Sequence, residues 1–427
     1  MDWIPALVMF ALFAANVPVA FAIAIAALSF FMMTQGTQTE FFIQRLVRIT
    51  YSFPLLAIPF FIFLGVVINH SGMGRRIMNL AHVLTGHMVG GLAQVNVVLS
   101  LLMAGMTGSS VAEAAMESRI LVPEMTQRGY DKAFSAAITA CSALIATMIP
   151  PSIGLILYGI LADVSIGRLF VAGIVPGILL CVALMLVVKL VSRRRGYIPS
   201  RAQKASLKEV ALASRDAFWA LVIPFGIVGG MRIGIFTPTE VGAAAAVYAT
   251  LVGMFVYREL NWRKLVETVL ETVLLTSVVM MIISAANSLG FYLAWQEIPM
   301  RAAQSVLAVS NDPHVFLIMF NVFVLVLGMF MDGAMILVLL TPLLVPIIHF
   351  YGIDPVHFGV LFMLNLEIGA VTPPVGIVMY TTISIVDVPM EHYAREALPM
   401  FAALILVLFA ITFVPAVSLT LPGLLFD

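Results

Sequence analysis

Long stretches of apolar residues without a charged side chain recur along the chain, and short polar segments separate them. Eight of these stretches hold 20 residues or more, at 3–39, 49–74, 77–112, 133–162, 169–188, 272–296, 333–353 and 397–426. A helix needs about 20 apolar residues to cross a lipid bilayer. The pattern therefore predicts an all-α polytopic membrane protein.

Helix-breaking residues interrupt the stretches that are too long for one straight crossing. Stretch 77–112 contains Gly105 and Gly108, and stretch 133–162 contains the pair Pro150-Pro151. Non-helical backbone at membrane depth is tolerated only where it is buried in protein or lines a cavity. We therefore expect these stretches to be broken inside the protein.

Composition and charge agree with this class and exclude others. Hydrophobic residues make up 62% of the 427 residues and charged ones only 10%, whereas a soluble domain has about 25% charged residues. The 22 basic and 22 acidic residues cancel, which leaves no electrostatic footprint for a nucleic acid. The sequence also has no Gly-rich phosphate loop. We expect neither a soluble enzyme nor an ATPase.

A basic segment near the middle of the chain predicts its orientation. Eight lysines and arginines lie in 189–215, and three more lie in 258–264. Basic loops stay on the cytoplasmic side of a membrane, so both segments are expected there. The predicted division is a first half, a cytoplasmic linker and a second half, at 1–192, 193–216 and 217–427.

The two halves repeat at a shift of 223 positions. The residues of the first half that recur unchanged 223 positions later are Gly105-Met106, Leu121-Val122-Pro123, Gly129, Asp131, Pro150-Pro151 and Pro176. Paired breaks in two halves are the sequence signature of a transporter's midplane site. The span at 170–188 ends in the basic linker, whereas 398–426 has no basic residue after it. The repeats are therefore predicted to be inverted, with paired re-entrant hairpins and Pro-Pro-broken helices.

The segment from Ala104 to Ser110 is rich in Gly, Ser and Thr, and it predicts a re-entrant hairpin with its tip at the midplane. The repeat places Asp332-Gly333 where Ser109-Ser110 stand. Carbonyl and hydroxyl oxygens at such a tip are hard ligands that suit an alkali cation. Close helix packing through small residues is the alternative interpretation.

The two Pro-Pro breaks supply a second set of candidate ligands. Thr147 stands just before Pro150-Pro151, and Thr372 just before Pro373-Pro374. Consecutive prolines remove amide donors and free the carbonyls one turn earlier, and freed carbonyls can bind a cation. A kink without a ligand is the alternative for either break.

Carboxylates inside predicted spans are functional candidates by default. They are Glu113, Glu117, Glu240, Asp332 and Glu367. An internal ion pair with Arg119 is an alternative for Glu117. Asp332 has no lysine or arginine within thirty positions, so it is expected to face a cation or a cavity, or to be protonated.

Several motifs resemble the large membrane subunit of tripartite ATP-independent periplasmic (TRAP) transporters, the dicarboxylate-transporter M type. They are MTGSSVAEAAM (106–116), MIPPSIGLILYG (148–159), TPTEVGAAAA (237–246), GIDPVHFG (352–359) and NLEIGAVTPPVG (365–376). The motifs are long, stand in the family's order and are spread over the whole chain.

The resemblance implies a sodium-coupled importer of organic anions in the bacterial inner membrane, of the ion transporter superfamily and working as an elevator. A periplasmic substrate-binding protein would deliver the substrate, and a small four-span membrane subunit would brace the scaffold. The stretch 3–39 is expected to be a retained span, with the small subunit not fused ahead of it. C4-dicarboxylates, keto acids, sialic acid and sulfonates are all permitted substrates.

The resemblance also implies site residues for about two sodium ions. The first sodium site would comprise Ser109, Ser110, Thr147, Ile149 and Pro150, and the second Gly328, Asp332, Gly369, Thr372 and Pro373. The substrate is expected between the hairpin tips, near Gly105, Thr107, Gly108, Glu113, Ser152, Gly333, Asn365 and Glu367. The family usually has Asp where Glu113 stands, and small or apolar residues where Glu117 and Arg119 stand.

An antiporter and a passive channel would share some of these features, whereas an intramembrane protease would not. A citrate- or arsenite-type antiporter that needs no binding protein would share the paired hairpins and the TPTEVG motif. A passive channel would also contain broken helices, and coupled accumulation separates it from a transporter. An intramembrane protease is not expected, because Tyr130-Asp131 has no Gly-x-Gly-Asp motif after it.

Overall fold

The computed structural model describes residues 3–15, 17–34 and 39–426, and the regular elements in these ranges are all helices. The first half contains α1 (Ile4–Ala14), α2 (Val19–Met33), α3 (Thr39–Arg48), α4 (Ala57–His70), α5 (Met73–Thr85), α6 (Gly91–Thr107), α7 (Ser110–Gln127), α8 (Lys132–Ala143), α9 (Ile153–Leu161) and α10 (Ile166–Arg195). The second half contains α11 (Leu207–Arg232), α12 (Pro238–Leu251), α13 (Trp262–Trp295), α14 (Ile298–Val309), α15 (Pro313–Gly328), α16 (Gly333–Phe350), α17 (Pro355–Val371), α18 (Ile377–Val386), α19 (Met390–Phe413) and α20 (Ala416–Phe426). Short turns of other helix types are η1 (Ile49–Tyr51), η2 (Phe53–Leu56), η3 (Leu144–Thr147) and η4 (Val252–Val256).

The predicted membrane-spanning character is confirmed. Within the described residues, seven helical segments are long and apolar enough to cross a bilayer: Phe53–His70, Ile166–Arg195, Leu207–Arg232, Pro238–Val256, Trp262–Trp295, Gly333–Phe350 and Met390–Phe413. Large apolar side chains also cover their outer faces. On α13, for example, Leu270, Leu274 and Val278 are each at least 60% exposed. A surface of this kind suits lipid.

The long apolar stretches are broken, as predicted. Stretch 3–39 forms α1 and α2, with residues 16 and 35–38 outside the described part. Stretch 77–112 covers the end of α5, all of α6 and the start of α7, and stretch 133–162 forms α8, η3 and α9. The chain leaves the helical conformation at Gly108 and at Pro150-Pro151, where a left-handed residue or a missing amide ends each helix. The predicted break at Gly105 is wrong, because Gly105 lies inside α6.

The predicted linker 193–216 is mostly helical at its two ends. α10 continues to Arg195 and stops at Gly196, whose φ of +70° favours glycine. α11 begins after Ser206, which forms a capping box with Glu209. Only residues 196–206 are therefore non-helical.

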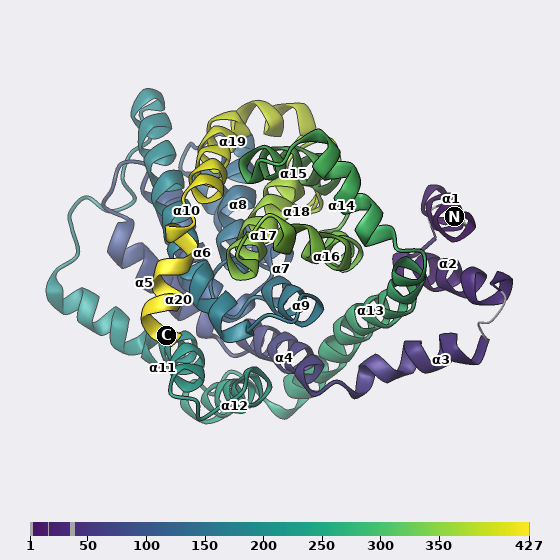
Figure 1. Ribbon diagram of the computed structural model, residues 1–427. Helices are drawn as coiled ribbons and strands as arrows, with labels where there is room; N and C mark the ends of the chain where they lie inside the picture. Colours follow the sequence, from purple (N-terminus) through teal and green to yellow (C-terminus); the bar gives the residue numbers. More distant parts are fainter. Residues whose placement is uncertain (1–2, 16, 35–38, 427) are drawn as a thin grey trace.

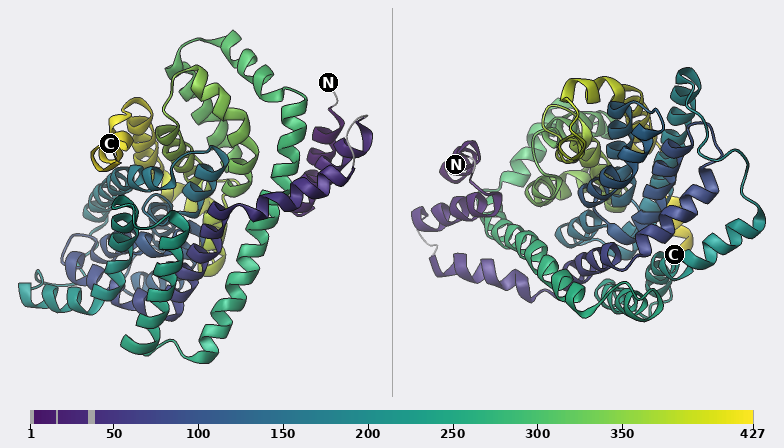
Figure 2. Two further views of the ribbon diagram at one scale, coloured as in Figure 1. Left: turned by 60° about the horizontal axis from the view of Figure 1, so that its bottom comes forward. Right: turned by 180° about the vertical axis from the view of Figure 1, so that it is seen from behind.

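The helices form two groups that lie side by side (Figure 1). A central bundle consists of α6–α10 and α15–α20, and an outer arc consists of α1–α4 and α11–α13. The helix α5 leads from the arc into the bundle, and α14 does the same in the second half. Figure 2 shows α13 running along the edge of the molecule as its longest helix.

A few helices join the two groups. From the arc, α4 packs against α6 and α9, α11 packs against α6, and α13 packs against α16. By contrast, the main neighbours of α7 and α18 are each other and further elements of the central bundle, including α8. The half of the bundle that holds α7 and α18 is therefore less covered by the arc.

Candidate functional site

The first hairpin tip lies where α6 gives way to α7. Gly108 ends α6 with a φ of +62°, which a glycine adopts without steric cost. Ser109 caps α7 because its hydroxyl accepts a hydrogen bond from the Ala112 amide at 3.4 Å. Ser110 is the first residue of α7 and is buried. The Gly- and Ser-rich segment thus forms a tight turn between two packed helices.

This tip rests on the first Pro-Pro break. A Cβ atom added to Gly108 would lie 2.5 Å from the carbonyl oxygen of Pro151, so the two backbones are in direct contact. Thr147 closes η3 and donates its hydroxyl to a carbonyl at 2.8 Å. Ser152 caps α9 by accepting from a backbone amide at 3.3 Å. The structure therefore brings the tip and the break together.

Two predicted residues at this break are held by neighbouring helices. Ile149 lies against Gly177 of α10, where an added Cβ would approach the Ile149 side chain to 2.7 Å. Pro150 is buried within the bundle. The backbone of this break is thus fixed on its α10 side.

The second hairpin tip is built differently, around a carboxylate. Asp332 caps α16, and its Oδ1 atom accepts hydrogen bonds from the amides of Ala334 at 3.0 Å and Met335 at 3.4 Å. Asp332 is exposed, and Gly333 follows it as the first residue of α16. A charge at the start of a helix is stabilised by the positive end of the helix dipole.

The second tip is fixed to the second break through backbone contacts. A Cβ atom on Gly369 would lie 2.6 Å from the Cα atom of Gly328. The carbonyl of Met329 accepts hydrogen bonds from the amides of Val375 at 3.2 Å and Gly376 at 3.0 Å. Each tip therefore contacts the backbone at or just before a break.

Two further predicted residues lie at the second break. Thr372 ends α17, and its hydroxyl donates to the carbonyl of Ile368 at 2.6 Å. Pro373 follows and is half-buried. Because the Thr372 hydroxyl has used its hydrogen, its oxygen lone pairs remain the part that could face a cation.

Glu367 interacts with residues of both hairpins. Its carboxylate, on α17, stands next to the Ser110 side chain and within electrostatic reach of Asp332. It is buried, and its Oε2 atom has no hydrogen-bond partner in the described part of the chain. A buried acceptor without a partner costs free energy unless a cation, proton or ligand satisfies it.

Two further buried carboxylates, those of Glu113 and Glu117, lie along the first hairpin. Glu113 accepts a hydrogen bond from the Thr107 hydroxyl at 2.7 Å. Glu117 accepts from the Ser100 hydroxyl at 3.1 and 3.2 Å. The ion pair of Glu117 with Arg119, an alternative from the sequence, is not formed among the described residues; Glu117 is buried, whereas Arg119 is exposed.

Two predicted substrate residues face neighbouring helices. Asn365 donates hydrogen bonds to the backbone and side-chain oxygens of Asn321, both at 3.0 Å. A Cβ atom on Gly105 would lie 2.7 Å from the Pro224 ring of α11. The structure therefore shows Gly105 in close helix packing, and the roles of Gly105 and Asn365 toward the substrate stay predictions.

Sequence reasoning missed the polar partners of these residues. Ser100 lies in α6 together with the polar residues Gln94, Asn96 and Thr107, and Asn321 lies between apolar residues of α15; Ser100 and Asn321 are both buried and hydrogen-bonded. A polar residue within an apolar stretch was the only available signal. Glu240, by contrast, is exposed and forms a capping box with Thr237, which explains it as a helix cap.

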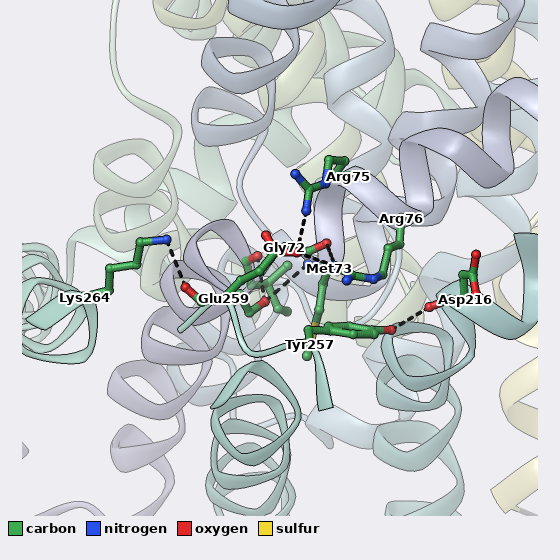
Figure 3. A network of polar contacts seen from close by, with 10 residues as sticks. Gly72, Met73, Arg75, Arg76, Asp216, Tyr257, Glu259 and Lys264 are labelled. Carbon is green, nitrogen blue, oxygen red and sulfur yellow. Dashed lines mark hydrogen bonds and ion pairs between the residues drawn. The ribbon is translucent and has the colours of Figure 1, made fainter. Parts of the chain in front are cut away.

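A network of polar contacts connects the start of α5 with the loop between α12 and α13 (Figure 3). Glu259 pairs with Arg75 and with Arg76, the latter at 2.8 Å. The Arg76 guanidinium lies 3.8 Å from the centre of the Tyr257 ring, and Lys264 donates to the Glu259 carbonyl at 2.9 Å. The network ties the start of α5 to the loop before α13.

The fold and the paired breaks define a multi-pass membrane transporter, and comparison with known proteins identifies its family. Residues 6–417 match the family model described as tripartite ATP-independent periplasmic transporter, DctM component. The chain belongs to this family, whose characterised members are permease subunits and not enzymes.

Individual relatives and one solved structure agree. The sialic acid TRAP transporter large permease protein SiaM of Vibrio cholerae is 38% identical over 410 residues, which cover 96% of each chain. The C4-dicarboxylate TRAP transporter large permease protein DctM of Pseudomonas aeruginosa is 37% identical over 379 residues, covering 89% of this chain and 88% of that one. The crystal structure of the Alcanivorax borkumensis YdaH transporter shares the fold, with a TM-score of 0.64, 14% identity and 90% of each chain covered.

Proposed function

We propose that this chain is the membrane-embedded subunit of a sodium-coupled importer of organic anions in the bacterial inner membrane. The observation that carries the proposal is the seating of each hairpin tip on a Pro-Pro break. Gly108 contacts Pro151 in the first half, and Gly328 contacts Gly369 in the second. Two inverted repeats would explain why a tip contacts a break in each half, although the contacting residues occupy different repeat positions.

The residues at these contacts suit sodium. Around the first tip, Ser109, Ser110 and Thr147 offer hydroxyl oxygens, and the backbones of Ile149 and Pro150 offer carbonyls. Around the second tip, Asp332 and Thr372 offer side-chain oxygens, and the backbones of Gly328, Gly369 and Pro373 offer carbonyls. The unpartnered Oε2 atom of Glu367 lies between the two sets. Bound sodium would supply the positive charge that the carboxylates here lack.

The organic anion would bind between the two tips. The helices α7 and α16 both begin there, at Ser110 and Gly333, and helix N-termini favour negative charge. The relatives named for sialic acid and C4-dicarboxylates both transport carboxylates. We infer a carboxylate-bearing substrate for this chain as well.

The grouping of the helices supports an elevator mechanism. In it the central bundle, which carries both tips, would move against the outer arc, with α5 and α14 as the links. The exposed apolar surface of the arc would contact the small four-span membrane subunit. A periplasmic binding protein would deliver the anion, as the family's tripartite description implies.

Proteoliposomes that contain both membrane subunits test the proposal. Uptake of N-acetylneuraminate and of succinate is measured with the matching binding protein, under an inward sodium gradient and in choline buffer. Accumulation that needs both sodium and the binding protein supports the proposal. Uptake that persists without the binding protein favours the antiporter-like alternative, and equilibration without accumulation favours a passive channel.

A further inference from the structure

A cavity lies away from the hairpin tips, between α7, the start of α8 and the end of α18. Its volume is about 520 Å³, and it is lined among others by Ser118, Arg119, Val122, Thr126, Lys132 and Ile385. Pockets that bind small molecules have volumes of about 300–1,000 Å³. The cavity is therefore large enough for a small organic anion.

The charge of this cavity is positive. Arg119 and Lys132 line it, and its lining includes no aspartate or glutamate. In the described part of the chain, Arg119 takes part in no ion pair, and the Lys132 ammonium donates to the backbone carbonyl of Asp387 at 3.2 Å. Neither cation is thus neutralised by a carboxylate within salt-bridge distance.

A buried hydroxyl and apolar walls complete the cavity. Ser118 is fully buried, and its Oγ atom has no hydrogen-bond partner among the described residues. Val122 and Ile385 give apolar contact surface. Cations beside apolar walls are a combination that holds a carboxylate with a short carbon skeleton.

The position of the cavity connects it with the candidate transport site. The helix α7 begins at Ser110 in that site, and Arg119 follows nine residues later, which is about 14 Å along the helix. The helix α18 begins beside the second break and ends at Val386, which also lines the cavity. Both helices therefore lead from the tips to this cavity.

The basic residues near the outer end of the cavity indicate that this end faces the cytoplasm. Just beyond α7, Arg128 donates to the backbone carbonyl of Ser200 at 3.2 Å, within the basic segment. Basic segments stay in the cytoplasm. The two helices that border the cavity also lack extensive cover by the outer arc.

We propose that this cavity is an anion-binding site on the exit route to the cytoplasm, where Arg119 and Lys132 hold the carboxylate of a departing organic anion. The identity of the anion as transported cargo rests on the proposed function. The binding site itself rests only on the cavity and its two cations.

Thiol chemistry at the rim tests the site. Thr126→Cys is introduced into the two-subunit complex in nanodiscs of phosphatidylcholine, and its reaction with two methanethiosulfonates is timed. One reagent carries a sulfonate and the other a trimethylammonium group. The native Cys141 and Cys181 are buried. We expect the anionic reagent to react about fivefold faster, and succinate to slow it relative to potassium chloride of equal ionic strength.

Two variants make the result specific. Added to Thr126→Cys, Arg119→Gln should abolish both the preference for the anionic reagent and the succinate protection. Arg128→Gln removes a nearby cation that does not line the cavity, and it should change both by less than about twofold. Equal rates for the two reagents, or protection that survives Arg119→Gln, would overturn the proposal.

A lipid control and an independent uptake assay show what a positive or negative labelling result means. A preference that appears only when phosphatidylglycerol is added to the nanodiscs would assign the cations to lipid headgroups and overturn the site. Sodium-driven uptake is measured independently in proteoliposomes. Loss of that uptake with an intact labelling pattern refutes the proposed function alone, whereas normal uptake without the pattern refutes the exit site alone.

Discussion

Gly369 and Gly328 face each other so closely that a Cβ atom on Gly369 would lie 2.6 Å from the Cα atom of Gly328. Gly328 ends α15 and Gly369 lies in the last turn of α17. The second hairpin can therefore reach the second broken helix only because neither position carries a side chain.

Gly369→Ala should separate the second hairpin from α17. Overpacking of this kind costs about 1–3 kcal/mol, so we expect a lower melting temperature of the two-subunit complex and loss of sodium-driven uptake. Gly290→Ala is the matched control, since Gly290 is also helical and has nothing within 4 Å of an added Cβ. Wild-type uptake by Gly369→Ala would show that the contact is not needed.

Asp332→Asn should raise the sodium concentration needed for half-maximal uptake without unfolding the protein. An asparagine still caps α16, so the variant removes the charge and keeps the hydrogen bonds to Ala334 and Met335. Asp332→Ala should in addition lower stability by about 1 kcal/mol, because it removes the cap. Ser109→Ala should have a smaller effect on sodium, because Ser109 is neutral. An unchanged sodium dependence in Asp332→Asn would remove Asp332 from the second sodium site.

Gly72→Ala should loosen the polar network of Figure 3. Gly72 has a φ of +76°, and an added Cβ would overlap the carboxylate of Glu259. The displaced carboxylate would lose its contacts with Arg75 and Arg76. Gly234→Ala is the control, because Gly234 has a φ of +74° but no neighbour within 4 Å. Each alanine should cost about 1–2 kcal/mol of backbone strain, and any extra loss in melting temperature for Gly72→Ala measures the network.

Protonation of the Glu259 carboxylate should lower the melting temperature of the protein in acid. Burial raises the pKa of Glu259, but hydrogen bonds and charges from Arg76 and Arg75 outweigh it and hold the pKa below its ordinary value of 4.5. A lowered folded-state pKa means that the ionised carboxylate stabilises the fold above about pH 4.5 and loses this effect as the pH falls through the folded value. Melting temperatures between about pH 7 and pH 4 should decline less steeply for Glu259→Gln than for the parent. Parallel curves would contradict this assignment.

Local chemistry made the breaks predictable from sequence. Gly108 and the two Pro-Pro pairs end helices through their own backbone restrictions, whatever surrounds them. Asp332 as a helix cap is equally local, since an aspartate before an apolar helix is a common start signal. The motif grouping likewise paired each tip with the break on which the structure seats it.

Contacts between distant residues were not predictable in the same way. Gly105 meets Pro224, and Ser100 meets Glu117, through helix packing that no short motif encodes. The exposure of Arg119 depends on which face of α7 its neighbours cover, and the buried Glu113 and Glu117 show that side-chain polarity does not mark that face. The positive cavity beside α18 was missed for the same reason.

The helix α13 contains 34 residues between Trp262 and Trp295, which gives a length of about 51 Å. The hydrocarbon core of a bilayer is only about 30 Å thick, so α13 either tilts or extends beyond the core at its charged first turns, which hold Arg263, Lys264 and Glu267. The tilt of a long helix changes as the bilayer thickens or thins. Because α13 packs against α16 of the second hairpin, any such change of tilt would be transmitted to that hairpin.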